Sequence, residues 1–219
     1  MSEKAFNDTM TLVGDTRYPV VSSHSGFTQI AHGDENNEGN RTPSQITDMI
    51  NLGGMFAVIP HQEGSLGQMS QVASSASAII DYTCGNSSQA LAQAYRYAIN
   101  HTRGGPVGFG TDLNGFAGWP SPRFGPEACS GGGNSTGEPM LTYPATIKAT
   151  GVSIPVEKSV VGERTYDFNF DGFAHIGMLP DMIADFEAMG MQPSELDALF
   201  FSAEGYVRLW ERADYMRTP

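Results

Sequence analysis

Three short apolar runs stand out in the hydrophobic pattern, and polar residues follow each of them. The runs lie at 18–23, 55–60 and 106–112, with Gly, Ser, Asn or Pro close to their ends. A continuous apolar run of this length between turn residues is typical of a strand buried in a sheet. We therefore predict three strands at these positions.

The stretches between and after these runs have the spacing of amphipathic helices. Ahead of the third run, apolar residues recur at intervals of three and four at Leu91, Ala94, Tyr95, Ala98 and Ile99. Thr42 and Gln45 have capping-box spacing, and Gly53 can end the helix that they begin. We predict helices over 2–13, 42–53, 86–105, 178–190, 193–200 and 202–216, the last one capped by Ser202.

The order strand, helix, strand, helix, strand over 18–115 predicts an α/β fold with a parallel sheet and outer helices. A chain of 219 residues fits one domain, 1–219. Within that domain, residues 116–165 are rich in Gly, Pro and Ser. Loops of this length are usually functional covers or disordered, so we predict a loop-rich insertion there.

Charge and hydropathy narrow the classes of function and partner. The formal net charge is −12, with only 12 Lys and Arg, so a nucleic-acid backbone would be repelled. No apolar run reaches the roughly 18 residues that cross a bilayer, which predicts no membrane span. The first residues, "MSEKAFNDTM", lack the basic and apolar regions of a signal peptide. We therefore expect a soluble protein and favour the cytoplasm as its compartment.

The two cysteines, Cys84 and Cys129, leave two alternatives open. They include no CxxC pair, which excludes a zinc finger. A disulfide between them would close a long loop and would stabilise the fold by roughly 4 kcal/mol in the chain-entropy model. Two free thiols are the alternative.

Candidate site residues lie where the predicted strands end. His24, His61 and Asp112 each come at or just after the end of one of the three runs. The carboxyl ends of parallel strands meet at one edge of a sheet, where α/β folds bind their ligands. Three such ends carrying His, His and Asp therefore predict a functional site there.

Several segments in series resemble the carboxyl-terminal part of the membrane (renal) dipeptidase family of metal-dependent amidohydrolases. They are "SHSG" at a strand end, Arg41 in the following loop, "GFGTDLNG" at a later strand end, and the helical segments "HIGMLPDMIADFEAMG" and "ALFFSAEGYVRLWE". The resemblance implies a partial (β/α)8 (TIM) barrel containing strands six to eight, with outer helices. The insertion at 116–165 resembles an elaboration found in bacterial relatives.

The resemblance also implies roles for individual residues. His24 would be a metal ligand, and Arg41 would bind the substrate carboxylate, which suits the planar guanidinium fork. Asp112 would carry the proton of the attacking water or the leaving amine. Asn114 stands where the family often has a second Asp beside the substrate, which puts that polar contact in doubt. The implied cofactor is zinc or another divalent metal.

The chain departs from the family pattern in its metal ligands. The family takes most ligands from an HxD motif, a glutamate and a histidine on earlier strands, and this sequence contains no HxD. The chain begins "MS", which in the family follows the last of these ligands, so we expect a truncated barrel that starts at an internal methionine. His61 and His175 are possible substitute ligands. With most ligands missing, the metal itself could be absent from this chain.

These observations leave three functional hypotheses. The first is a zinc-dependent hydrolase in which water attacks a small amide or dipeptide. The second is an esterase-type hydrolase without the metal centre, which would need a serine or cysteine nucleophile beside a base. The third is a non-catalytic fragment that persists as an oligomer.

Three barrel strands alone would leave two open sheet edges and a bare inner face. We therefore predict that the chain forms a homodimer or higher homo-oligomer, or that residues 116–165 fold back over the bare face.

Overall fold

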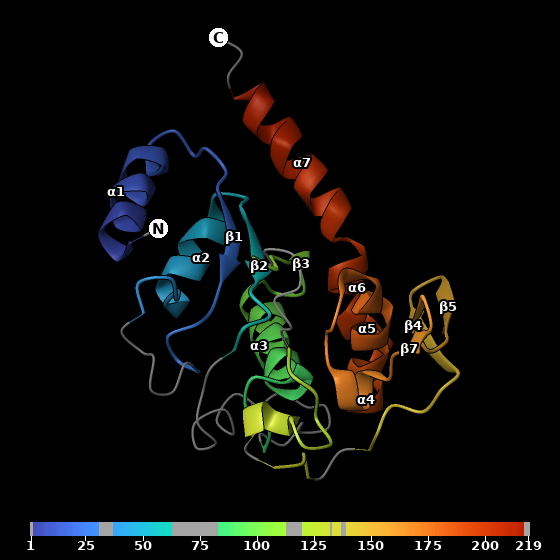
Figure 1. The fold of residues 1–219 in the computed structure, drawn as a ribbon. Coiled ribbons are helices and arrows are strands. Elements are labelled where there is room, and N and C mark those ends of the chain that lie inside the picture. The colour runs from blue at the N-terminus through green and yellow to red at the C-terminus, as the bar shows by residue number, and fades with distance from the viewer. Residues whose placement is uncertain are drawn as a thin grey trace.

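A three-stranded parallel sheet lies at the centre of the protein in a computed structural model. The structure describes residues 2–30, 37–62, 83–112, 120–131, 133–136 and 139–216. The strands of the sheet are β1 (Val21–Ser25), β2 (Met55–Val58) and β3 (Val107–Phe109), in the order β1-β2-β3 (Figure 1). Both pairings are parallel, as the sequence predicts. The chain is thus a mixed α/β protein.

In the described residues, three α-helices precede or connect the strands, and each begins at a capping side chain. They are α1 (Glu3–Gly14), α2 (Pro43–Asn51) and α3 (Ser88–His101). The predicted capping box of α2 is confirmed, because Thr42 Oγ1 accepts from the Gln45 N–H and the Gln45 side chain accepts from the Thr42 N–H. Ser87 caps α3 through the Gln89 N–H.

One face of the sheet packs into the main core. Phe56 of β2 stacks on Phe27 with 5.0 Å between ring centroids, and Phe109 of β3 lies 5.0 Å from Tyr95 of α3. The Tyr95 hydroxyl donates to the Val107 carbonyl at 2.6 Å. Burial of these rings explains why the apolar runs form strands at this place.

The start of the last helix lies against the opposite face. Helices α4 (Phe168–Asp171), α5 (Leu179–Ala188), α6 (Pro193–Phe200) and α7 (Ser202–Tyr215) follow the insertion. A Cβ placed on Gly108 would lie 3.5 Å from the Ala57 side chain and 4.0 Å from that of Ser202. The sequence leads us to expect that this face of the sheet is bare unless residues 116–165 or a second copy of the chain cover it. That expectation needs correction, because residues of α7 lie on the face. The homo-oligomer itself stays a prediction.

The cap predicted for this last helix is wrong. The residue in the cap position of α7 is Phe201, and no side chain caps the helix through a hydrogen bond. Ser202 is instead the first helical residue. Figure 1 shows α7 extending away from the sheet toward the C-terminus.

Residues 116–165 contain more regular structure than the composition predicts. Two antiparallel hairpins lie in the second half of the range. The first consists of β4 (Ala145–Ala149) and β5 (Val152–Val156), and the second of β6 (Val160–Val161) and β7 (Arg164–Thr165). The turn Thr150–Gly151 joins the first pair, with Gly151 at φ 74°, a conformation that favours glycine. Ile147 of β4 is buried in the main core.

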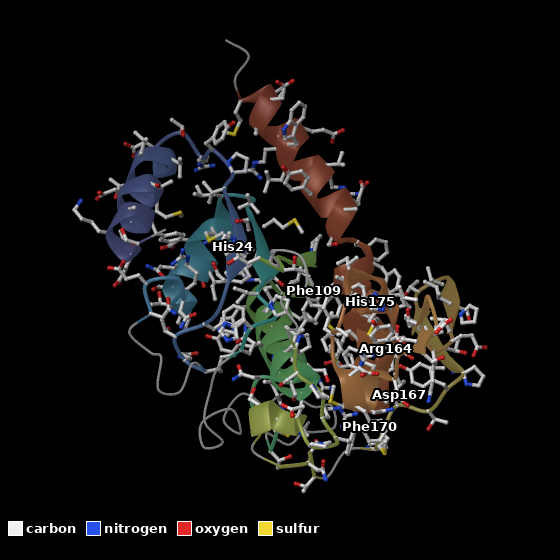
Figure 2. The ribbon with its side chains drawn as sticks, viewed as in Figure 1. His24, Phe109, Arg164, Asp167, Phe170 and His175 are labelled. Carbon is white, nitrogen blue, oxygen red and sulfur yellow. A yellow bond between two sulfur atoms is a disulfide. The ribbon has the colours of Figure 1, made fainter. Side chains whose placement is uncertain are left out.

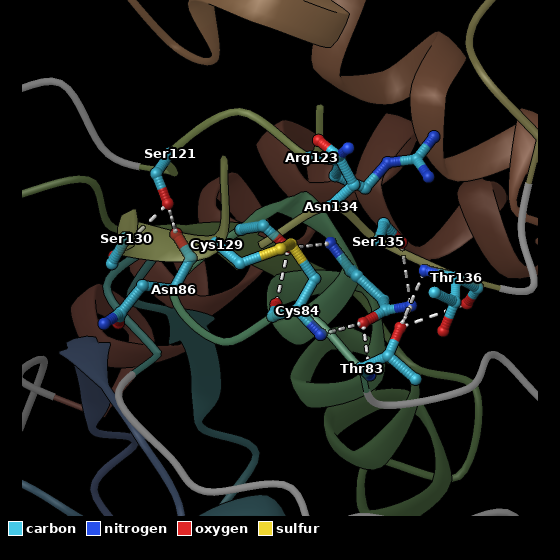
Figure 3. The surroundings of a disulfide bond; sticks show 12 residues. Thr83, Cys84, Asn86, Ser121, Arg123, Cys129, Ser130, Asn134, Ser135 and Thr136 are labelled. Atoms are coloured by element: carbon cyan, nitrogen blue, oxygen red, sulfur yellow. Dashed lines mark hydrogen bonds between the residues drawn. A yellow bond between two sulfur atoms is a disulfide. The ribbon is translucent and has the colours of Figure 1, made fainter. Parts of the chain in front are cut away.

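A disulfide joins Cys84 and Cys129, which settles the alternative that the sequence leaves open. Figure 3 shows the bond between the segment that leads into α3 and the segment around a short 3-10 helix (Ala128–Gly131). The Cys84 N–H donates to Gln89 Oε1 at 2.7 Å, and Cys84 is fully buried. The bond therefore fastens the first half of the insertion to the helix that follows β2.

A buried ion pair between Arg123 and Asp185 also holds this segment. Arg123 donates from Nε and Nη2 to the two carboxylate oxygens of Asp185 on α5, at 3.0 and 2.5 Å. Ser88 of α3 also donates to Asp185 at 2.5 Å. The carboxylate thus connects α3, α5 and the insertion. Among the described helices, none has the length and apolar character needed to cross a membrane.

Candidate functional site

The carboxyl end of β1 departs from regular pairing with β2. Val21 pairs with Met55 and Ser22 with Phe56, but Ser25, three positions on, pairs with Val58, only two positions on. One extra residue on β1 makes a bulge, and the bulge contains Ser23 and His24. On a regular strand these neighbours would point to opposite faces.

The bulge separates the side chains of this stretch into two pairs. Ser22 and Ser25 are buried, and their hydroxyl oxygens lie 2.5 Å apart. Ser23 and His24 are both exposed, and Ser23 Oγ lies 2.9 Å from His24 Nδ1. The bulge therefore brings a serine and a histidine together on the accessible side.

A glycine makes room for the bulge. A Cβ placed on Gly110, just after β3, would lie 1.7 Å from the Ser23 carbonyl oxygen and 2.9 Å from the His24 Cα. No side chain can occupy that space without a backbone shift. The end of β3 thus lies directly against the bulge of β1.

A cavity of about 250 Å³ opens beside β1. His24, Arg41 and His61 all contribute to its wall, together with Asn37 and Asn40. The remaining lining residues that the structure describes are Phe6, Val21, Ser22, Ser23, Ser25, Gly26, Gly39 and Ile59. Among the described lining residues there is no Asp or Glu, although the whole chain carries a net charge of −12.

Arg41 is the most buried charged group of this wall, with 4% of its surface exposed. Its backbone N–H donates to the Gly26 carbonyl at 3.0 Å, which joins the loop to the end of β1. The guanidinium donates from Nη1 to the Glu38 and Asn40 carbonyls at 2.9 and 3.1 Å. Its Nε is buried and has no hydrogen-bond partner among the described residues.

Helix α1 supplies the outer contact of this guanidinium. The Arg41 Cζ lies 4.5 Å from the centroid of the Phe6 ring, a cation–π distance. Burial lowers the pKa of Arg41, and the carboxylate of Glu3 partly offsets this. The Gln45 side chain donates to Asn7 Oδ1 at 3.0 Å and so ties α1 to α2.

Asp112, another predicted site residue, is not among the described residues of the pocket wall. Asp112 is exposed after the end of β3, at φ 48°, and it does not line the cavity, so its catalytic role stays a prediction. Asn114 falls outside the described residues.

His175 lies in another part of the molecule, at the start of the helical segment before α5 (Figure 2). Its Nδ1 accepts from the Gly177 N–H at 3.1 Å, and its Nε2 lies 3.3 Å from Ser159 Oγ. Both ring nitrogens are therefore engaged. The structure does not support His175 as a substitute metal ligand beside His24.

The described residues do not fit a divalent metal centre. No group of three or more His, Cys, Asp or Glu side chains that could hold an ion occurs in the described part of the chain. Zinc sites take at least three protein ligands, and the cavity offers two imidazoles beside a guanidinium. A buried cation in the wall repels a metal ion and attracts an anion.

Strand-end reasoning finds the histidines of the pocket but misses Ser23 and Phe6. Ser23 gives no signal in the sequence, because the alternation of a regular strand would turn it away from His24. Phe6 lies in α1, which precedes the first strand of the sheet in the sequence. Its place above Arg41 follows only from the packing of α1.

The fold and the cavity define a mixed α/β protein with a pocket beside β1 whose described wall contains Arg41 and two histidines. No family model matches the chain, and no curated protein matches its sequence. Among solved structures, it is similar to an amidohydrolase from Pseudomonas aeruginosa, with 14% identity and a TM-score of 0.45. The match covers 94% of this chain and 49% of that one, so this chain spans about half the length of the amidohydrolase.

Proposed function

We propose that this protein binds a small carboxylate-bearing molecule in the cavity at the end of β1, and that the molecule is the substrate of a hydrolase. The observation that carries the proposal is Arg41, a buried guanidinium in the cavity wall whose Nε has no described partner. A guanidinium presents several N–H donors in a fork that matches a carboxylate.

The electrostatics of the cavity support an anion. His24, His61 and Arg41 all contribute to the wall, and no described Asp or Glu lines it, although the Glu3 carboxylate acts on Arg41 from outside the wall. In a chain with a net charge of −12, most of the surface repels anions. A local cluster of positive and neutral donors therefore makes this cavity the place where a small carboxylate is attracted.

The hydrolase part of the proposal rests on the sequence resemblance to metal-dependent amidohydrolases of the membrane dipeptidase type. It implies a small amide or dipeptide as substrate and a sheet that is part of a barrel. The described residues offer no group of three ligands for zinc, so the proposal contains no metal-dependent step. Arg41 would fix the carboxylate end of the substrate and leave its carbonyl near the bulge of β1.

The test is calorimetric binding of N-acetylglycine and, as a neutral control ligand, of its methyl amide. The carboxylate should bind more tightly, because only it can accept two charge-assisted hydrogen bonds from Arg41. Arg41→Lys should weaken carboxylate binding by about 10-fold to 100-fold, since losing a hydrogen bond to a charged group costs about 1.5–3 kcal/mol.

The matched control variant is Arg208→Lys, which changes an exposed arginine paired with Glu204 on α7. It should leave the binding of N-acetylglycine unchanged. Equal affinity of the wild-type protein for the acid and the amide would contradict the proposal without any variant, and circular dichroism would verify that each variant is folded.

A further inference from the structure

We infer that Ser23 and His24 form a nucleophile–base pair that hydrolyses small carboxylate-bearing esters without a metal ion. The inference rests on the proposed function, because Arg41 is taken to hold the carboxylate of the ester. It assigns the chemistry to two adjacent residues of one strand. The observation behind it is the 2.9 Å contact between Ser23 Oγ and His24 Nδ1.

The contact is a product of the bulge. Adjacent side chains on a regular strand point to opposite faces and cannot meet. The extra residue between Ser22 and Ser25 removes this alternation, so that Ser23 and His24 turn to the same side. Bulges of this kind occur next to active sites, where they redirect side chains.

The pair also lies in the right place for a substrate. Ser23, His24 and Arg41 line the same cavity. Ser23 and His24 are exposed, so a bound molecule can reach the hydroxyl, while Arg41 is buried in the wall. A nucleophile within hydrogen-bond reach of a base, in the wall of the same cavity as a cation, is the first part of the arrangement that covalent catalysis uses.

The reaction balances with water as the only co-reactant. Ser23 Oγ attacks the ester carbonyl carbon as its proton passes to His24 Nδ1. The C–O bond to the alcohol then breaks, and the alcohol leaves with that proton. Water attacks the acyl-serine, its proton passes to His24, and the acid is released as the proton returns to Ser23 Oγ.

The structure favours esters over amides as substrates of this pair. In the described residues, no carboxylate is hydrogen-bonded to His24 Nε2 to orient the ring. An alkoxide or phenoxide leaves more readily than an amine, so a pair without this third group is suited to the easier reaction. An activated ester with a free carboxylate is therefore the substrate class.

The chain contains a second serine–histidine contact that serves as an internal control. Ser159 Oγ lies 3.3 Å from His175 Nε2, but this pair lines none of the cavity around Arg41. The other nitrogen of His175 accepts from the Gly177 N–H. Removing Ser159 should therefore leave ester hydrolysis unchanged.

The experiment measures hydrolysis of mono-4-nitrophenyl succinate, with 4-nitrophenyl acetate as the ester that lacks a carboxylate, in the presence of a chelator. Ser23→Ala and His24→Gln should each lower kcat for the succinate ester by at least about 100-fold. Ser159→Ala should retain the wild-type rate. Diisopropyl fluorophosphate should label the tryptic peptide that contains Ser23.

The outcomes separate this inference from the proposed function. Wild-type turnover that survives in Ser23→Ala, or a label on another serine, overturns the inference. If N-acetylglycine binds to the wild-type protein but no ester is hydrolysed, the inference fails while the proposed function stands. If the carboxylate does not bind, the proposed function fails, and Ser23-dependent hydrolysis of the acetate ester would still support the pair.

Discussion

At the scale of single residues, burial changes the pKa of Asp181, a carboxyl group that does not line the pocket. Only 2% of its surface is exposed, and one carboxylate oxygen accepts from the Tyr143 hydroxyl at 2.6 Å. Burial raises the pKa of Asp181, and the hydrogen bond from Tyr143 only partly offsets this. The folded protein therefore holds this proton more tightly than the unfolded chain does.

This raised pKa predicts the sign of a pH effect on stability. As pH rises above about 4, the unfolded carboxyl loses its proton before the folded one, so the free energy of unfolding falls. Asp181→Asn keeps an acceptor for Tyr143 and removes the titration. Urea denaturation between pH 4 and pH 7 should show the variant losing less stability than the wild type as pH rises.

The control for that comparison is Asp8→Asn, which changes an exposed carboxylate paired with Lys4 on α1. Its stability should follow pH as the wild type does. If the curve of Asp181→Asn also ran parallel to that of the wild type, the burial argument would be contradicted.

The residue scale also shows how far the sequence can predict the candidate site. His24, Arg41 and His61 share one cavity, and the strand-end rule together with the family resemblance points to all three. Asp112 follows its strand as predicted, but the chain turns at a positive φ and leaves the carboxylate exposed. The spacing of residues in the sequence does not predict a local backbone angle of this kind.

At the scale of elements, the bulge of β1 depends on the glycine that follows β3. Gly110→Ala would place a methyl group 1.7 Å from the Ser23 carbonyl oxygen, so the backbone of one strand must move. We expect the variant to lose about 1–3 kcal/mol of stability, the usual cost of overpacking. The Ser23–His24 contact and ester hydrolysis should be lost with it.

Gly108→Ala in the same strand is the matched control. There a new methyl group would meet the Met55 and Ala57 side chains at 3.4 and 3.5 Å, which is ordinary contact. Both variants can be compared by urea denaturation and by turnover of the succinate ester. Equal behaviour of the two would show that the bulge tolerates a shift at Gly110.

The elements themselves differ in how well the sequence predicts them. The strands of the sheet follow from short apolar runs, and α2 follows from a complete capping box. The composition of 116–165 predicts loops and hides the hairpin β4–β5. The signal of this hairpin is local and lies in the alternation of "ATIKA" and "VSIPV" around a Thr-Gly turn.

At the scale of the whole molecule, the disulfide changes the expected compartment. Disulfides persist mainly in oxidising environments and are rare in the cytosol. The bond between Cys84 and Cys129 is therefore more typical of a protein of an oxidising compartment than of a cytosolic one. The sequence leaves this point open because the pairing depends on how the insertion folds back onto α3.

The same bond predicts a measurable part of the stability. It joins residues 45 positions apart, and closing a loop of that length stabilises the fold by roughly 4 kcal/mol in the chain-entropy model. Urea denaturation of the Cys84→Ser/Cys129→Ser double variant should show a loss of that order. Reductant should destabilise the wild type and leave the double variant unchanged; a wild-type curve that ignored reductant would contradict the prediction.

The disulfide also makes a covalent ring out of part of the chain. The ring runs from Cys84 through α3 and β3 to Cys129, so one edge of the central sheet belongs to it. A protease that cut any single peptide bond inside the ring would open it without separating the two products. The carboxyl end of β1 lies outside the ring and the end of β3 lies inside it. A nicked molecule would therefore keep β1 and β3 in one covalent assembly until the sulfur bridge was reduced.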